Sequence, residues 1–87
     1  MADPLTDAQQ EVQKDRDLLR DNPQSPERYN WRNALAAALC DRLAPVLRPL
    51  RPDDAAAAAR EGIGITQELL AEGAFPRSRQ GFAERIA

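Results

Sequence analysis

Proline placement is the feature that most constrains the fold of this 87-residue chain, which contains seven prolines. A proline inside a helix removes one backbone hydrogen bond and clashes with the preceding turn, so long helices end or bend where prolines cluster. Apolar residues between the proline clusters recur every three or four positions, which is the period of an amphipathic helix. The pattern predicts a single all-α domain, 1–87, with about four antiparallel helices over residues 5–21, 26–48, 53–72 and 76–87.

Residues that favour helix ends flank these segments. Thr6 with Gln9 matches a capping box at the start of the first helix. Ser25-Pro26 is typical of a helix start, and Asp53-Asp54 is expected to cap the third helix and complement its dipole. Gly73 follows the third segment and is suited to the left-handed conformation that closes a helix.

The second segment carries the strongest apolar stripe and an interior proline. The stripe comprises Trp31, Leu35, Ala38, Leu39, Leu43, Val46, Leu47 and Leu50. Because its phase continues past Pro45, we predict a helix that is kinked near residue 45 rather than ended there. Trp31 leads the stripe and is expected to anchor the core.

The two ends of the chain resemble each other at a separation of 51 residues. Leu18-Leu19 aligns with Leu69-Leu70, and Trp31 aligns with Phe82. A repeated order of helix end, proline-containing break and aromatic-led helix start suggests stacked helical hairpins.

The hairpin pattern resembles the tetratricopeptide repeat (TPR) family. Its first-helix spacing is matched by Trp31, Ala34, Leu35 and Ala38. Its second-helix packing positions are matched by Ala55, Ala59 and Gly62. TPR units are normally 34 residues long, so the 51-residue spacing requires longer helices or loops. The resemblance implies a TPR-like helical-hairpin array that binds a protein or associates with itself, while a small helical bundle remains the alternative.

Composition excludes several classes of protein. The formal net charge of −2 argues against a nucleic-acid binder, and no apolar run approaches the ~20 residues of a membrane span. The first residues do not resemble a signal peptide, and a lone cysteine fits a cytoplasmic protein. Abundant alanine, with eleven arginines against one lysine, suggests a GC-rich bacterial source.

The sequence offers no catalytic, cofactor-binding or metal-binding residues. Cys40 is the one nucleophile of interest, but the chain has no histidine to activate it, so we expect a structural thiol. Asp15, with Asp17 and Asp21, is expected on a solvated helix face. Gly62 is expected to mark a close approach between helices. We therefore predict a protein that is not an enzyme.

Charge alternates along the chain. Residues 1–24 carry a net charge of −3, 25–51 of +3, 52–75 of −4 and 76–87 of +2. The simplest interpretation is surface pairing between neighbouring helices, where each pair contributes a few tenths of a kcal/mol.

The functional interpretation of the charges follows from the TPR resemblance, in which the two basic segments would line a common groove. The predicted partner-binding residues are Arg28, Arg32, Arg77 and Arg79, and the predicted ligand is an acidic peptide or protein, because arginine binds carboxylates in a bidentate manner. The alternative is a small regulatory or accessory subunit, antitoxin-like or enzyme-associated, that is stabilised on its partner. A homo-oligomer is also compatible with so small a core.

Overall fold

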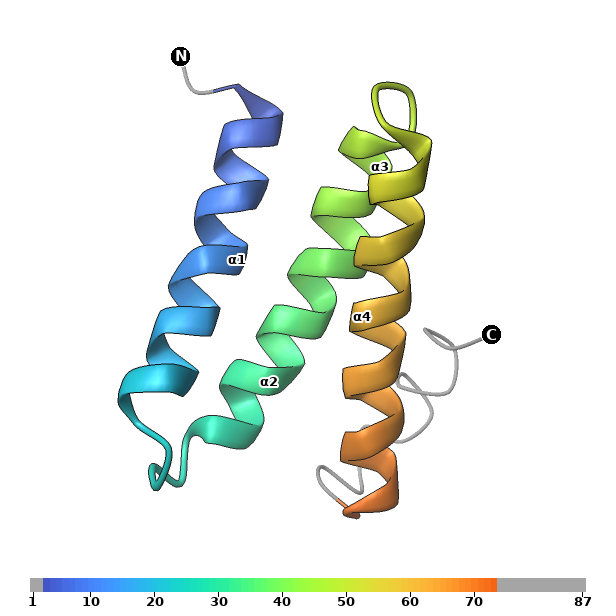
Figure 1. Cartoon of the computed structure of the whole chain (residues 1–87). Helices are drawn as coiled ribbons and strands as arrows, with labels where there is room; N and C mark the ends of the chain where they lie inside the picture. Colours follow the sequence, from blue (N-terminus) through green and yellow to red (C-terminus); the bar gives the residue numbers. More distant parts are fainter. Residues whose placement is uncertain (1–2, 74–87) are drawn as a thin grey trace.

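The computed structural model describes residues 3–73, which form an antiparallel arrangement of helices (Figure 1). The elements are α1 (Pro4–Asp21), α2 (Arg28–Ala37), the π-helix η1 (Ala38–Leu43), α3 (Ala44–Leu47) and α4 (Pro52–Ala71). Since α2, η1 and α3 follow one another without a break, they form one central helix, residues 28–47, and the described chain has three helices. Residues 3–73 contain no strand, which confirms the all-α prediction.

The central helix packs between α1 and α4, which lie on either side of it (Figure 1). The three helices that the structure describes give no evidence of a TPR repeat. The fourth predicted helix, 76–87, lies outside the described residues, as does the part of the second copy of the 51-residue repeat that follows residue 73. None of the described helices combines the length and apolar character needed to cross a membrane.

Helix α1 begins one residue earlier than predicted, and its cap differs from the expected one. Asp3 is the N-cap, and its carboxylate accepts a hydrogen bond from the amide of Leu5 at 3.3 Å. Pro4 occupies the first helical position, where its missing N–H costs nothing. The Thr6 hydroxyl donates to the Asp3 carboxylate instead of capping the helix itself.

The other two helices also begin at residues that differ from the predicted ones. The Ser25 hydroxyl accepts a hydrogen bond from the Glu27 amide at 3.1 Å, which closes a turn, and α2 begins only at Arg28. The side chains of Asp53-Asp54 are not caps, because Arg51 is the N-cap of α4 and Pro52 its first residue. Both acids instead lie in the first turn of α4, where they complement the positive end of the helix dipole.

The close of α4 matches the prediction. Gly73 follows the helix with a φ of +73°, in the left-handed region that glycine adopts without steric cost. Its amide donates to the carbonyl of Leu70 at 3.1 Å, which satisfies one of the last backbone acceptors of the helix.

The helix continues through Pro45 because the turns before it are widened. The amide of Ala44 donates to the carbonyl of Leu39, five residues earlier, as in a π-helix. Proline in a regular α-helix clashes with the carbonyl four residues before it, and a π-helical segment is a common way for a helix to change its hydrogen-bond register. The prediction that the helix does not end at Pro45 is therefore confirmed, and the irregularity takes the form of a π-helix over Ala38–Leu43.

The core is centred further toward the C-terminal end of the central helix than the sequence suggested. The largest fully buried side chains are Leu39, Leu69 and Thr66. Trp31 is partly buried and is not among the buried residues of the main cluster, so the cluster lies further along the helix than the residue predicted to anchor it. That cluster is made of Val12, Leu35, Ala38, Leu39, Ala44 and Ala58. The alanines of the cluster allow the helices to approach closely. The space between the helices is filled by aliphatic rather than aromatic side chains.

Gly62 lies where α4 crosses the central helix most closely. A Cβ atom at this position would stand 2.4 Å from the Cys40 Sγ, 2.9 Å from the Ala36 carbonyl oxygen and 3.3 Å from the Leu39 Cβ. Real Cβ atoms essentially never approach other atoms within 3.0 Å. The predicted close helix–helix approach at Gly62 is confirmed.

Candidate functional site

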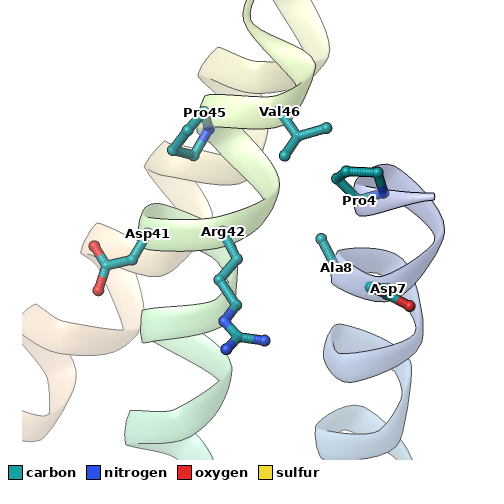
Figure 2. Close-up of a pocket in the computed structure, with 7 residues that line it drawn as sticks. All are labelled: Pro4, Asp7, Ala8, Asp41, Arg42, Pro45 and Val46. Carbon is teal, nitrogen blue, oxygen red and sulfur yellow. The ribbon is translucent and has the colours of Figure 1, made fainter. Parts of the chain in front are cut away.

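A pocket of about 320 Å³ opens between the first turns of α1 and the last part of the central helix. It is lined by Pro4, Asp7 and Ala8 of α1 and by Asp41, Arg42, Pro45 and Val46 of the central helix (Figure 2). Figure 2 shows Pro4 and Val46 on facing sides of the space, with the Arg42 side chain reaching toward α1. The walls are mainly apolar, and the volume suits an apolar side chain.

The pocket follows from the residues that begin α1 and end the central helix. Figure 1 shows α1 and α3 separating toward this end of the molecule. Ala8 is buried but contributes only a methyl group, so it cannot fill the space between the separating helices. The rings of Pro4 and Pro45 supply rigid apolar surface without a backbone N–H that would need a partner.

The charged residues around the pocket leave an acidic rim. Arg42 forms an ion pair with Glu11, which joins the central helix to α1. The carboxylates of Asp7 and Asp41 are exposed, and neither forms an ion pair with another residue of 3–73. The Asp41 side chain points away from α1 (Figure 2), so the unpaired carboxylate on the α1 side of the pocket is that of Asp7. The local excess of negative charge favours a cationic group near the mouth of the pocket.

An exposed leucine lies in the turn that follows the pocket-lining part of the central helix. Leu50 follows Val46 by four residues, and the turn that carries it continues the helical path, with its amide donating to the Leu47 carbonyl at 2.9 Å. The side chain of Leu50 is 63% exposed. Arg48, on the same turn, is exposed and makes no ion pair with the part of the chain that the structure describes. We call the pocket together with residues 48–50 the pocket end of the molecule.

The arginines predicted to bind a partner are placed differently. The Arg32 side chain is only 13% exposed, and its guanidinium donates to Glu72 at 2.6 and 3.1 Å and to Glu68 at 3.3 Å. It also lies 5.8 Å from the centre of the Tyr29 ring. These contacts join α2 to α4, so any acidic ligand of Arg32 has to displace two carboxylates of the protein itself.

The electrostatics of this cluster agree with its geometry. The hydrogen bond from Arg32 lowers the pKa of the Glu72 carboxyl, and the bond to Glu72 raises the pKa of Arg32. Arg28 lies one turn before Arg32, is exposed, and makes no ion pair within residues 3–73. Arg77 and Arg79 lie outside the described residues, so the structure does not bring the four predicted arginines together.

Ion pairs between helices account for much of the charge alternation. Arg32 and Arg42 of the basic central helix pair with glutamates of the acidic α4 and α1, as the simpler interpretation of the charges expects. Arg16 of α1 makes a bidentate pair with Glu61 of α4, with both contacts at 2.7 Å. Exposed ion pairs such as Arg16–Glu61 contribute only about 0.2–1 kcal/mol each to stability. Their main effect is therefore to fix how the helices lie against one another.

Asp15 departs from the solvated position predicted for it. Its exposure is 6%, because it faces the central helix on the same side of α1 as Ala8 and Val12. Burial, reinforced by the nearby charge of Glu11, raises the pKa of the Asp15 carboxyl, while Lys14 opposes the rise. The periodicity of α1 already places residue 15 near the apolar stripe, which was the available signal.

Asp15→Asn is expected to raise the melting temperature at about pH 7. Because the folded-state pKa of Asp15 lies above its ordinary value of 3.8, the folded protein binds this proton more tightly than the unfolded chain does. Ionised Asp15 therefore lowers stability above the folded-state pKa, and this penalty disappears as the pH falls below 3.8. Thermal unfolding at about pH 7 and about pH 3.5 measures the difference. The matched control Asp41→Asn, at an exposed carboxylate, is expected to change little at either pH. An equal effect of Asp15→Asn at both would contradict the assignment.

Cys40 occupies a structural position. Its thiol is half-buried and lies 3.6 Å from the carbonyl oxygen of Ala59, against the close crossing at Gly62. Within residues 3–73, no three side chains of the metal-binding types come together.

No protein-family model, no curated protein and no solved structure shows significant similarity to this chain.

Proposed function

We propose that this protein is a non-catalytic protein–protein interaction module that receives an apolar side chain of its partner in the pocket between α1 and α3. The observation that carries the proposal is the pocket itself, which is open, mainly apolar and lined on the α1 side by Asp7, whose carboxylate makes no ion pair within residues 3–73. A cytoplasmic location is part of the proposal and is supported by the single cysteine.

The chemistry of the rim defines the partner. The apolar lining favours an aliphatic side chain and comprises Pro4, Ala8, Pro45 and Val46. The carboxylate of Asp7 favours a neighbouring arginine or lysine. Apolar burial supplies affinity, and the charges supply orientation and faster association. The expected ligand is therefore a leucine-like side chain flanked by basic residues.

A second candidate is the acidic partner expected from the arginine-rich segments. Arg28 favours it, because this guanidinium is exposed and makes no ion pair within residues 3–73, although its charge also helps to lower the pKa of Glu72. Against it, Arg32 is already bound by Glu68 and Glu72. The accessory-subunit interpretation, in which the chain is stabilised on its partner, is compatible with either surface.

A pair of matched peptides distinguishes the two candidates. One carries a central leucine flanked by arginines, and the other has glutamates in place of the arginines. Titrated into ¹⁵N-labelled protein, the arginine peptide is expected to shift the backbone amides of Asp7, Ala8, Asp41 and Val46, whereas the glutamate peptide leaves them unchanged. Shifts at Arg28 and Arg32 with the glutamate peptide would favour the acidic partner instead. No shift with either peptide at about millimolar concentration, where even weak complexes form, would refute both.

A further inference from the structure

We propose that the partner is a second copy of this chain, and that two copies join pocket end to pocket end, each placing its Leu50 in the pocket of the other. This inference rests on the proposed function, since it uses the same pocket. It adds the identity of the occupant, which comes from three properties of the pocket end.

The first property is that the chain carries the ligand its own pocket requires. Leu50 and Tyr29 are the large hydrophobic residues exposed among residues 3–73, and Leu50 is the more exposed, at 63% against 41%. Moving such an exposed leucine side chain out of water lowers the free energy of the system. Its neighbour Arg48 makes it a leucine with a basic flank, as the acidic rim prefers.

The second property is that donor and acceptor lie at the same end of the molecule. The loop that follows α3 and the first turn of α1 both lie at the top of Figure 1. Two copies related by a two-fold axis therefore each give one leucine and receive one, which closes the assembly as a dimer. A donor at the opposite end from the pocket would instead produce open chains.

The third property is charge complementarity across such an axis. Arg48 makes no ion pair within the described residues, and neither does Asp7 at the pocket. Arg51, in contrast, already lies 3.9 Å from Asp54 of its own chain. A two-fold axis brings each Arg48 toward the Asp7 carboxylate of the other copy, so one contact pairs the two charges.

The contact surface is small, since each pocket takes one side chain. We expect a reversible dimer with a Kd of roughly 10–100 µM, typical of a weak interface. Sedimentation velocity of the purified full chain from about 10 µM to about 1 mM tests this directly, because that range spans the expected Kd.

Leu50→Asp removes the donor and adds a charge that the acidic rim repels. Because both copies lose a leucine, the Kd is expected to rise at least about a hundredfold, leaving a monomer across the whole range. Leu50 is exposed, so far-UV circular dichroism should show unchanged helicity. The matched control is Tyr29→Asp at the other exposed hydrophobic residue, which is expected to leave the dimer intact.

A charge exchange tests the orientation. Arg48→Asp is expected to weaken the dimer about tenfold, and adding Asp7→Arg in the same chain is expected to restore it. A wild-type protein that stays monomeric at about 1 mM, or a dimer indifferent to Leu50→Asp, would overturn the inference. If the protein is monomeric while the arginine peptide still shifts the pocket amides, the second copy is the wrong occupant and the proposed function stands. If neither occurs, both fail.

Discussion

Gly62→Ala is expected to lower the free energy of unfolding by about 1–3 kcal/mol, the usual cost of overfilling a packed interface. The added methyl group would stand 2.4 Å from the Cys40 Sγ and 2.9 Å from the Ala36 carbonyl oxygen. The second contact is with backbone, so the central helix and α4 have to move apart. Urea unfolding followed by circular dichroism at about 222 nm, the helical band, measures the change.

Gly64→Ala is the matched control, because it makes the same chemical change two residues further along the same helix. No atom lies within 4 Å of a Cβ built at Gly64. Alanine is the better helix former there, so this variant is expected to gain about 0.5–1 kcal/mol. Opposite signs for the two substitutions are the expected result. Equal effects would mean that α4 does not cross the central helix at Gly62.

Leu39→Ala is expected to cost about 2–5 kcal/mol, since it leaves a cavity between the central helix and its neighbours. Leu39 is 1% exposed and belongs to the main buried cluster. Small domains have a total stability of only about 5–15 kcal/mol, so the variant is expected to lose a large share of that stability and to melt at a clearly lower temperature.

Leu50→Ala provides the comparison, because this leucine is 63% exposed. It is expected to change stability by less than about 0.5 kcal/mol, as surface substitutions usually do. Thermal unfolding at low protein concentration measures both variants. A small effect of Leu39→Ala together with a large effect of Leu50→Ala would contradict the core described above.

Local signals predicted the approximate bounds of the three described helices. Proline clusters marked the breaks, and the uninterrupted apolar phase indicated that the helix continues through Pro45. Gly73 and Gly62 were recognised because each glycine solves a specific backbone problem, a left-handed closure or a close crossing. The caps were less predictable, since Asp3 and Pro4 compete with Thr6 for the same helix start.

Contacts between distant residues could not be predicted in the same way. Arg32 looked available in the sequence, but its partners Glu68 and Glu72 are 36 and 40 positions away. Trp31 heads an apolar stripe, yet the core is centred further along the helix, at Leu39. The pocket is equally non-local, since Pro4 and Pro45 line the same space only because α1 is antiparallel to the central helix. Leu50 and Val46 were the part of this surface visible in the sequence, as neighbours in the stripe around Pro45.

The central claim is that the binding surface is the pocket end and not the surface of α2 that carries Arg28 and Arg32, which we call the arginine face. Calorimetric titration of the arginine-flanked leucine peptide into two variants tests it most directly. Val46→Lys fills the pocket and repels a basic ligand, while Arg28→Glu alters the arginine face at the other end of the central helix. Circular dichroism establishes that both variants keep their helices. We expect Val46→Lys to abolish binding and Arg28→Glu to leave the Kd within about twofold of wild type, a difference below about 0.5 kcal/mol. Binding that survives Val46→Lys and is lost in Arg28→Glu would contradict the account.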